Sequence, residues 1–299
     1  MESPFSRIIL GTAQLGMKYG IANTTGRPEP AEVCQMLDAC REAGINTFDT
    51  AQAYGDSESV LGAWFGSLKD FFPNVITKLA PGTVLADYSE VFTSLEASLK
   101  RLRLRTLFCV MLHREDLLPE LDDAAGKVFS LLQRNGLVQN IGISVYSPKV
   151  AKQALLHPLI SIVQIPSSLL DRRFEKAGIF SLARKLGKQI HIRSVLLQGV
   201  VCMAPEDLKN SLKAFRPVVG EFRKLCSRYS QEPAGVALIW ALRRWEAAHC
   251  LIGVESLRQV HANIASLNFF DRFPPELERD LNSLRCPQDE RLLNPSLWD

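Results

Sequence analysis

The segment FDTAQAYGDSESVLG, residues 48–62, joins two kinds of predicted secondary structure. Its apolar start indicates the end of a β-strand, and Asp49 stands where that strand ends. A polar turn follows, in which Asp56 or Ser57 can cap the N-terminus of a helix. The segment therefore predicts one strand-then-helix unit whose short connecting loop carries Tyr54.

The same alternation of strand and helix patterns continues along the chain to residue 267. Eight short apolar runs are nearly continuous rather than alternating, which is typical of parallel strands buried on both faces. These predicted strands cover residues 7–13, 46–51, 74–80, 106–113, 140–146, 160–168, 189–197 and 249–254.

Segments of helical period lie between these strands. Residues 33–40, 91–102 and 257–267 place apolar side chains three and four positions apart, and Gly44 is a suitable stop after the first of them. No G-x-G-x-x-G motif follows the first strand, and no linker rich in proline or glycine divides the chain. We therefore predict that residues 1–299 form one domain, a closed (β/α)8 TIM barrel, rather than an open doubly wound sheet.

The residues after 270 contain one short helix pattern, from about Pro275 to Leu284, and then an irregular tail. Two interpretations of this tail are open. It can be a frayed chain end, as many termini are. Alternatively, it folds near the barrel mouth, where Trp298 would line a pocket.

Composition limits the classes of partner. Hydrophobic residues make up 46% of the chain and charged residues 22%, which suits a globular core. The formal net charge is only +3 and the basic residues are scattered, so we expect no nucleic-acid partner. No run of about 18 apolar residues occurs, so we expect no membrane partner either. A monomer is compatible with these features.

The seven cysteines form no C-x-x-C pair and have no metal-ligand spacing. Most lie in apolar runs, and the N-terminus resembles neither a signal peptide nor a transit peptide. We therefore expect reduced cysteines, no metal site and a cytoplasmic location.

Ionisable side chains gather at one predicted end of the strands. Asp49, Lys78 and His113 end three successive strands, and Tyr54 lies one short loop beyond Asp49. Active sites of (β/α)8 enzymes lie at this end of the barrel. A lysine held charged by a carboxylate favours the phenolate form of a neighbouring tyrosine, so Tyr54 becomes a proton donor, while an imidazole can orient a carbonyl oxygen.

Each of these residues also has a purely structural interpretation. Asp49 can cap a turn, Lys78 can be a solvated charge, His113 can be a hydrogen-bonded core histidine, and Tyr54 can be an amphipathic packing residue. Their joint occurrence favours catalysis, because a lysine and an aspartate on apolar strands are costly to bury unless they pair.

Characteristic motifs recur over nearly the whole predicted barrel: LGTAQLG, FDTAQAYGDSESVLG, ITKL, LHRED, GISVY, VQIPSSLL, RSVLLQG and LIGVESLRQVHANI. By these motifs the sequence resembles the aldo-keto reductase family, in the form of bacterial members often linked to surface-carbohydrate pathways. The resemblance implies a catalytic tetrad of Asp49, Tyr54, Lys78 and His113. It also implies NADPH as the cofactor, bound across the barrel mouth, with NAD as an alternative.

The resemblance further implies a set of cofactor-binding residues. Ser144 and Gln164 would bind the nicotinamide carboxamide. The segment after the seventh strand would contact the nicotinamide and pyrophosphate, and the segment after the eighth would hold the adenosine phosphate. The residues at these positions are Arg193, Ser194, Leu197, Gly199, Gly253, Ser256, Gln259 and Asn263.

Four departures from the family pattern stand out. Val145 replaces an asparagine, and Arg193 stands where many members have an aromatic residue on the nicotinamide. Glu255 lies where a 2′-phosphate would approach and would repel it unless Arg258 offsets that charge, so NADH competes with NADPH as the expected cofactor. The short N-terminal stretch leaves little room for the β-hairpin that often closes the barrel bottom in this family.

We therefore expect an NAD(P)H-dependent oxidoreductase that reduces an aldehyde or ketone, with a sugar-derived carbonyl as one candidate. Residues in or near the loops and tail are candidates for the substrate pocket: Tyr19, Arg114, Tyr146, Arg172 and Trp298. Two alternatives remain. One is a Schiff-base aldolase with Lys78 as nucleophile, and the other is a cofactor-binding regulatory or scaffold protein on the same fold.

Overall fold

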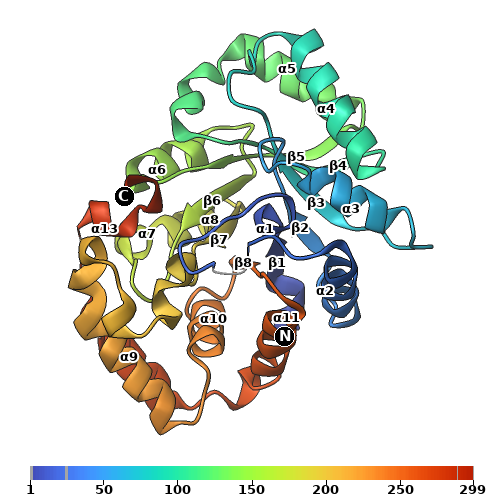
Figure 1. Ribbon diagram of the computed structural model, residues 1–299. Helices are drawn as coiled ribbons and strands as arrows, with labels where there is room; N and C mark the ends of the chain where they lie inside the picture. The colour runs from blue at the N-terminus through green and yellow to red at the C-terminus, as the bar shows by residue number, and fades with distance from the viewer. Residues whose placement is uncertain (1–2, 24–25, 288, 299) are drawn as a thin grey trace.

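The computed structural model describes residues 3–23, 26–287 and 289–298, and within them eight parallel strands close into a barrel. The strands follow one another around the barrel in chain order, and β1 pairs with β8 to close it. Figure 1 shows the strands at the centre with the helices around them. The predicted (β/α)8 barrel is confirmed.

The element bounds follow the predicted pattern closely. The strands are β1 (Ile8–Gly11), β2 (Thr47–Asp49), β3 (Asn74–Lys78), β4 (Leu107–Leu112), β5 (Val138–Ser144), β6 (Ile162–Pro166), β7 (Gln189–Arg193) and β8 (His249–Gly253). The helices are α1 (Ala13–Gly16), α2 (Pro30–Glu42), α3 (Ser57–Phe65), α4 (Tyr88–Leu102), α5 (Asp123–Arg134), α6 (Pro148–Leu156), α7 (Arg173–Lys176), α8 (Ile179–Lys185), α9 (Arg216–Arg228), α10 (Pro233–Arg244), α11 (Leu257–Leu267), α12 (Pro275–Ser283) and α13 (Glu290–Leu293). Short 3-10 helices connect several of them, at Pro4–Arg7, Glu115–Glu120, Leu197–Cys202, Pro205–Asp207, Asn210–Phe215, Phe270–Arg272 and Pro295–Leu297.

Helix α4 illustrates how the sequence forms an outer helix. The Asp87 carboxylate accepts a hydrogen bond from the backbone N–H of Glu90 at its start, and Arg103 ends it in a left-handed conformation. Its predicted apolar stripe, Val91, Leu95, Leu99 and Leu102, is buried. Each such leucine stabilises the fold by about 1.5–3 kcal/mol relative to an exposed side chain.

The inside of the barrel is packed with apolar side chains. Ile9, Ile76, Cys109, Met111 and Ile162 form their own buried cluster there, apart from the core between strands and helices. This layer separates the polar residues at the two ends of the barrel. The interior is therefore a core and not a channel.

The C-terminal tail is ordered and lies near the barrel mouth. Arg172, in the loop after β6, donates hydrogen bonds to the carbonyls of Leu281 and Asn282 at 2.8 Å each. The Cys286 thiol contacts the carbonyl of Leu169 in the same loop at 3.2 Å. Figure 1 shows α13 and the C-terminus beside α7 and α6. The frayed-end interpretation is wrong for the described part of the tail.

The loop that carries Tyr54 is held against α1 by close backbone contact. A Cβ atom on Gly16 would overlap the carbonyl oxygen of Tyr54 and come within 2.7 Å of the Ser57 N–H nitrogen. Gly55, with φ of +57°, faces the Gly16 carbonyl from the other side. Two glycines thus allow the approach that fixes Tyr54 at the end of β2.

We expect Gly16→Ala to destabilise the fold by roughly 1–3 kcal/mol, because the atoms that must move belong to the backbone. It should also lower turnover by moving Tyr54. Urea unfolding and steady-state kinetics on the same samples check both effects. Gly220→Ala is the matched control, since the nearest atom to its Cβ is Pro205 Cγ at an ordinary 3.6 Å. A Gly16→Ala protein as stable and active as Gly220→Ala would contradict the proposed contact.

Candidate active site

Lys78 and Asp49 form an ion pair inside the barrel. Lys78 ends β3 with 1% of its surface exposed, and Asp49 ends β2 with 2% exposed. The lysine ammonium donates to Asp49 Oδ1 and also to the carbonyl of Thr50 at 2.9 Å. Because two buried charges are tolerated only when they are paired and hydrogen-bonded, this geometry gives both side chains a defined position.

Gln164 contacts the pair from the other side of the barrel. Its Nε2 donates to Asp49 Oδ2 at 2.8 Å, although β6 and β2 are not neighbouring strands. Both carboxylate oxygens of Asp49 therefore have a donor. Sequence reasoning assigned Gln164 to the cofactor alone and missed this bond, which links residues 115 positions apart.

Tyr54 and His113 lie next to the ion pair. The Lys78 Nζ atom is 4.9 Å from the centre of the Tyr54 ring. The Tyr54 and His113 rings meet edge to face, with centroids 5.8 Å apart and planes at 78°. The four residues predicted to form the tetrad are thus brought together at the carboxyl ends of β2, β3 and β4.

Burial and charge set the protonation of two of these groups. Burial alone would lower the pKa of Lys78, but the charge of Asp49 and then that of Tyr54 raise it by more, so the ammonium stays charged. Burial, followed by the charges of Lys78, Arg193 and Arg114, lowers the pKa of His113 to about 4. The site therefore holds a charged lysine beside a neutral imidazole at neutral pH.

Further residues from the predicted cofactor and substrate sites lie near the tetrad. The Arg193 guanidinium stacks 3.9 Å from the centre of the Tyr146 ring and donates to Ser144 Oγ and the Val145 carbonyl, both at 3.2 Å. Burial and then the charge of Tyr54 raise the pKa of Tyr19, which places that phenol near the tetrad. The exposed Arg114 forms an ion pair with Asp116 at 2.8 Å.

Two candidates for the substrate pocket have structural roles instead. The Arg172 guanidinium stacks 4.9 Å from the Trp240 ring centre, besides its bonds to Leu281 and Asn282. The Trp298 indole N–H donates to the carbonyls of Arg291 and Leu292 at 3.1 Å each. These contacts hold the tail together, because both side chains direct their donors at the tail backbone.

Ser144 and Gln164 suit a carboxamide group. Ser144 ends β5, and its register partner Gln164, in the middle of β6, donates to Asp49, so both lie beside the tetrad. The Ser144 oxygen accepts from Arg193, which leaves its hydroxyl proton to donate, and Gln164 uses Nε2 on Asp49, which leaves Oε1 to accept. A carboxamide needs one donor and one acceptor, so the residues fit a nicotinamide.

The segment after β7 has an unusual backbone. Ser194, Leu197 and Gln198 have φ angles of +60°, +47° and +52°, and Gly199 has +91°. Left-handed non-glycine residues cost about 1–2 kcal/mol each, and such strain often marks a functional site. Gly199 also has a packing role, since a Cβ there would come within 2.5 Å of Ala22 Cβ.

The segment after β8 is largely occupied by contacts within the chain. Ser256 caps α11 by accepting from the N–H of Gln259 at 3.3 Å, and Gln259 Oε1 accepts from the N–H of Glu255 at 2.8 Å. A Cβ on Gly253 would overlap the Gln14 amide. Asn263, only 9% exposed, lines the interface between α11 and the barrel. Gly253 and Asn263 are therefore explained by packing.

A second carboxylate lies at the start of α11, where an anionic group was expected. Glu32 Oε1 accepts from the backbone N–H of Leu257 at 2.9 Å. Glu32 and Glu255 thus place negative charge on both sides of this helix N-terminus, a feature that no local sequence pattern indicated. Arg258 is exposed beside them.

The described residues contain neither a metal-binding group nor a helix that could span a membrane. Within residues 3–23, 26–287 and 289–298, no group of three histidines, cysteines or acidic residues is arranged to hold a metal ion. In the same ranges, no helix has the length and apolar character needed to cross a membrane.

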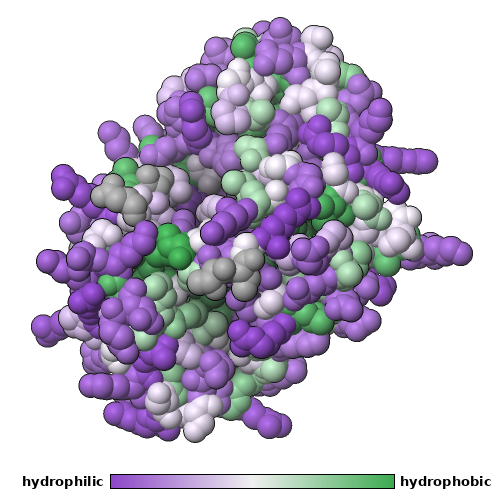
Figure 2. All heavy atoms as spheres, viewed as in Figure 1, coloured by the Kyte–Doolittle hydropathy of each residue, from purple (hydrophilic) through white to green (hydrophobic). Residues whose placement is uncertain are grey.

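The face drawn in Figure 2 is mostly hydrophilic, with small separate hydrophobic patches.

Known proteins with similar sequences include reductases, dehydrogenases and a protein named as a putative voltage-gated potassium channel subunit beta, from Schizosaccharomyces pombe, at 25% identity over 81% of each chain. Aldo-keto reductase str7 from Strobilurus tenacellus is 25% identical over 280 residues, which cover 86% of this chain and 82% of that protein. D-arabinose 1-dehydrogenase from Saccharomyces cerevisiae is 31% identical over 277 residues, which cover 85% of this chain and 81% of that protein.

The fold is shared with solved structures at lower identity. The holo form of aldo-keto reductase AKR11C1 from Bacillus halodurans superposes with a TM-score of 0.74 at 20% identity, over 95% of each chain. The sequence model of the aldo/keto reductase family matches residues 7–284, which span the whole barrel and α12. The chain therefore belongs to the aldo/keto reductase family and is an NAD(P)H-dependent oxidoreductase.

Proposed function

We propose that this enzyme reduces an aldehyde or ketone to an alcohol, with Tyr54 as the general acid. The observation that carries the proposal is the position of Tyr54 between the charged Lys78 and the neutral His113. When bound, the nicotinamide cofactor supplies the hydride that reaches the carbonyl carbon. Tyr54 then gives its proton to the carbonyl oxygen.

The other tetrad residues support this proton transfer in distinct ways. The Lys78 ammonium stabilises the phenolate that Tyr54 becomes, and Asp49 and Thr50 hold the ammonium in place. His113 is neutral, so it can donate a hydrogen bond to the carbonyl oxygen without adding a second charge to the site. Because Lys78 remains an ammonium, it is a poor nucleophile, which argues against a Schiff-base aldolase.

We propose that Ser144 and Gln164 hold the carboxamide, and that Arg193, Ser194, Leu197 and Gly199 contact the nicotinamide and pyrophosphate. Ser256 and Gln259 are at the adenosine end in this proposal. The carboxylates of Glu32 and Glu255 would repel a 2′-phosphate there, so we propose that the enzyme accepts NADH at least as well as NADPH.

A sugar-derived carbonyl is the substrate class that we favour. The opening carries Tyr19, Tyr146 and Arg193, whose phenols and guanidinium can bind hydroxyl groups. The similarity to a protein named D-arabinose 1-dehydrogenase supports the same class.

We further propose that residues 1–299 form a single domain that acts in the cytoplasm. One connected hydrophobic core runs from Ile8 to Leu293, which supports the single domain. Cys40, Cys109, Cys226 and Cys250 are buried thiols, as is usual for proteins of a reducing compartment.

Tyr54→Phe should lower kcat for carbonyl reduction by about a hundredfold or more, the scale of losing a general acid. Cofactor affinity should survive, because the ring remains. Steady-state kinetics and cofactor titration by tryptophan fluorescence measure the two quantities. Tyr229→Phe, on a tyrosine after α9, is a matched control that should keep full turnover. Full turnover in Tyr54→Phe would remove this residue from the mechanism.

Glu255→Gln should lower KM for NADPH by about fivefold with little effect on NADH, since it removes one charge near the 2′-phosphate. The measurement is the ratio of KM values for the two cofactors at one ionic strength. Glu276→Gln, exposed on α12, controls for a general change in charge. A ratio of KM values that is unchanged, or that shifts in favour of NADH, would count against the proposal that the adenosine phosphate binds near Glu255.

The pH dependence should reflect the low pKa of His113. The folded-state pKa of about 4 lies below the usual 6.5, so His113 stays neutral from pH 8 down to pH 5. We expect kcat/KM for reduction to lack a titration near pH 6.5 in that range. A step near pH 6.5 that disappears in His113→Gln would show that the imidazole is not neutral as proposed.

A further inference from the structure

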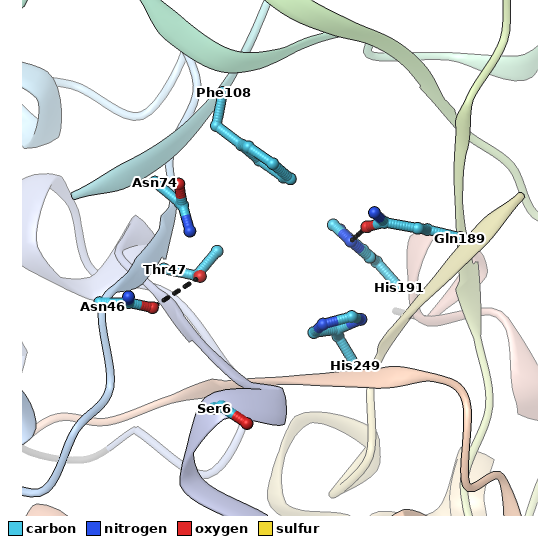
Figure 3. Close-up of a pocket in the computed structure, with 8 residues that line it drawn as sticks. All are labelled: Ser6, Asn46, Thr47, Asn74, Phe108, Gln189, His191 and His249. Atoms are coloured by element: carbon cyan, nitrogen blue, oxygen red, sulfur yellow. Dashed lines mark hydrogen bonds between the residues drawn. The ribbon is translucent and has the colours of Figure 1, made fainter. Parts of the chain in front are cut away.

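A cavity lies at the opposite end of the barrel from the tetrad. It has a volume of about 250 Å³, and Figure 3 shows the side chains around it pointing into a common space. Thr47, Asn74, Gln189 and His249, which line it, are each the first residue of their strand. The cavity is therefore at the amino ends of the strands, and the buried cluster around Ile76 and Met111 separates it from the active site.

The lining of this cavity is polar but carries no formal charge. Amides from Asn46, Asn74 and Gln189 combine with the hydroxyl of Thr47, which donates to Asn46 Oδ1 at 3.3 Å. The Phe108 ring supplies the apolar surface and also packs against the interior cluster. Among the described residues that line it, none is acidic, lysine or arginine.

His191 presents a buried acceptor to this space. It is 1% exposed, and its ring lies 5.3 Å from that of His249, its register partner on β8. The Nε2 atom contacts Gln189 Oε1 at 3.3 Å, and because an amide oxygen only accepts, Nε2 carries the proton. Nδ1 then holds a lone pair, and it is buried without a hydrogen-bond partner among the residues that the structure describes.

The protonation of His191 keeps that lone pair available. Burial, followed by the charges of His249 and Lys78, lowers the pKa of His191 well below 6.5, so the imidazole stays neutral. A buried acceptor without a partner costs free energy that a ligand donor can recover. The remaining question is whether this lone pair binds a metal cation or accepts a hydrogen bond from a hydroxyl group.

The charges near the cavity favour a hydroxyl group. A divalent cation would find no carboxylate or thiolate among the described lining residues, and the charge of Lys78 already acts against positive charge at His191. Hydroxyl groups, in contrast, both donate to imidazole nitrogens and pair with amides. A volume of 250 Å³ is many times the roughly 10–15 Å³ that one water molecule needs, so the cavity has room for a small ligand.

We propose that this cavity binds a small neutral polyol, such as an alditol or a monosaccharide, with His191 Nδ1 accepting from one hydroxyl group and the amides of Asn46, Asn74 and Gln189 binding others. The site is separate from the active site, and the inference does not rest on the proposed reduction. The Phe108 ring would cover the C–H face of the ligand.

The test is a calorimetric titration of the whole protein with sorbitol. We expect saturable binding to one site in the millimolar range. His191→Phe removes the acceptor and fills the space, so it should weaken binding about tenfold. Asn74→Leu, which removes one of the lining amides, should weaken binding by a similar factor. It is the test variant if His191→Phe does not fold. His261→Phe, the same change at an exposed histidine of α11, should bind like the wild type.

Three outcomes would overturn the proposal. One is no saturable binding to the wild type, which would leave a cavity filled by water. Another is binding that neither His191→Phe nor Asn74→Leu weakens, which would assign sorbitol to the active-site end. The third is Zn²⁺ bound by the wild type and lost in His191→Phe, with no polyol bound. Carbonyl reduction should be unchanged in both cavity variants, so failure of this proposal is distinguishable from failure of the proposed function.

Discussion

The ion pair of Lys78 and Asp49 is the constraint on which the active site depends. Both side chains are almost fully buried at the end of the barrel, where neither charge is solvated by bulk water. Loss of one partner of such a pair typically costs about 3–5 kcal/mol, because the other charge is then left uncompensated. The pair therefore tolerates little movement, and its position fixes the groups around it. Gln164 adds a third strand to this arrangement through the second oxygen of Asp49.

The buried ion pair contributes to the different protonation states of Lys78 and His113. Asp49 holds Lys78 as an ammonium, and burial, followed by that positive charge, lowers the pKa of His113. Tyr54 lies next to both, on a loop whose backbone is pressed against Gly16. One buried carboxylate thus supports a charged lysine beside a neutral histidine, which is the combination that the proposed proton transfer from Tyr54 uses.

Local sequence patterns were sufficient for the barrel and for the tetrad, because strand ends and their order determine which residues meet at the mouth. Each observed strand overlaps a predicted one, although β5 begins two residues before its predicted start, and Asp49 and Lys78 lie at strand ends as expected. The bond from Gln164 to Asp49 could not be predicted in this way, since it depends on the diameter of the closed barrel. The contact of Glu32 with the start of α11 likewise depends on how α2 packs beside that helix. The structural roles of Arg172 and Trp298 follow from the packed tail, which carries no local signal.

The apolar layer inside the barrel gives the two ends different chemistry. Because it excludes water, the charge of Lys78 acts over a longer range than it would in solution, and it influences both Cys109 within the layer and His191 beyond it. At the mouth, the negative charge of Asp49 largely compensates the positive charge of Lys78. At the other end no carboxylate lines the described cavity, and burial, followed by the charges of His249 and Lys78, keeps the pKa of His191 well below its usual value. A single lysine thus helps to lower the pKa of His113 at one end of the barrel and that of His191 at the other, in addition to the effect of burial on each.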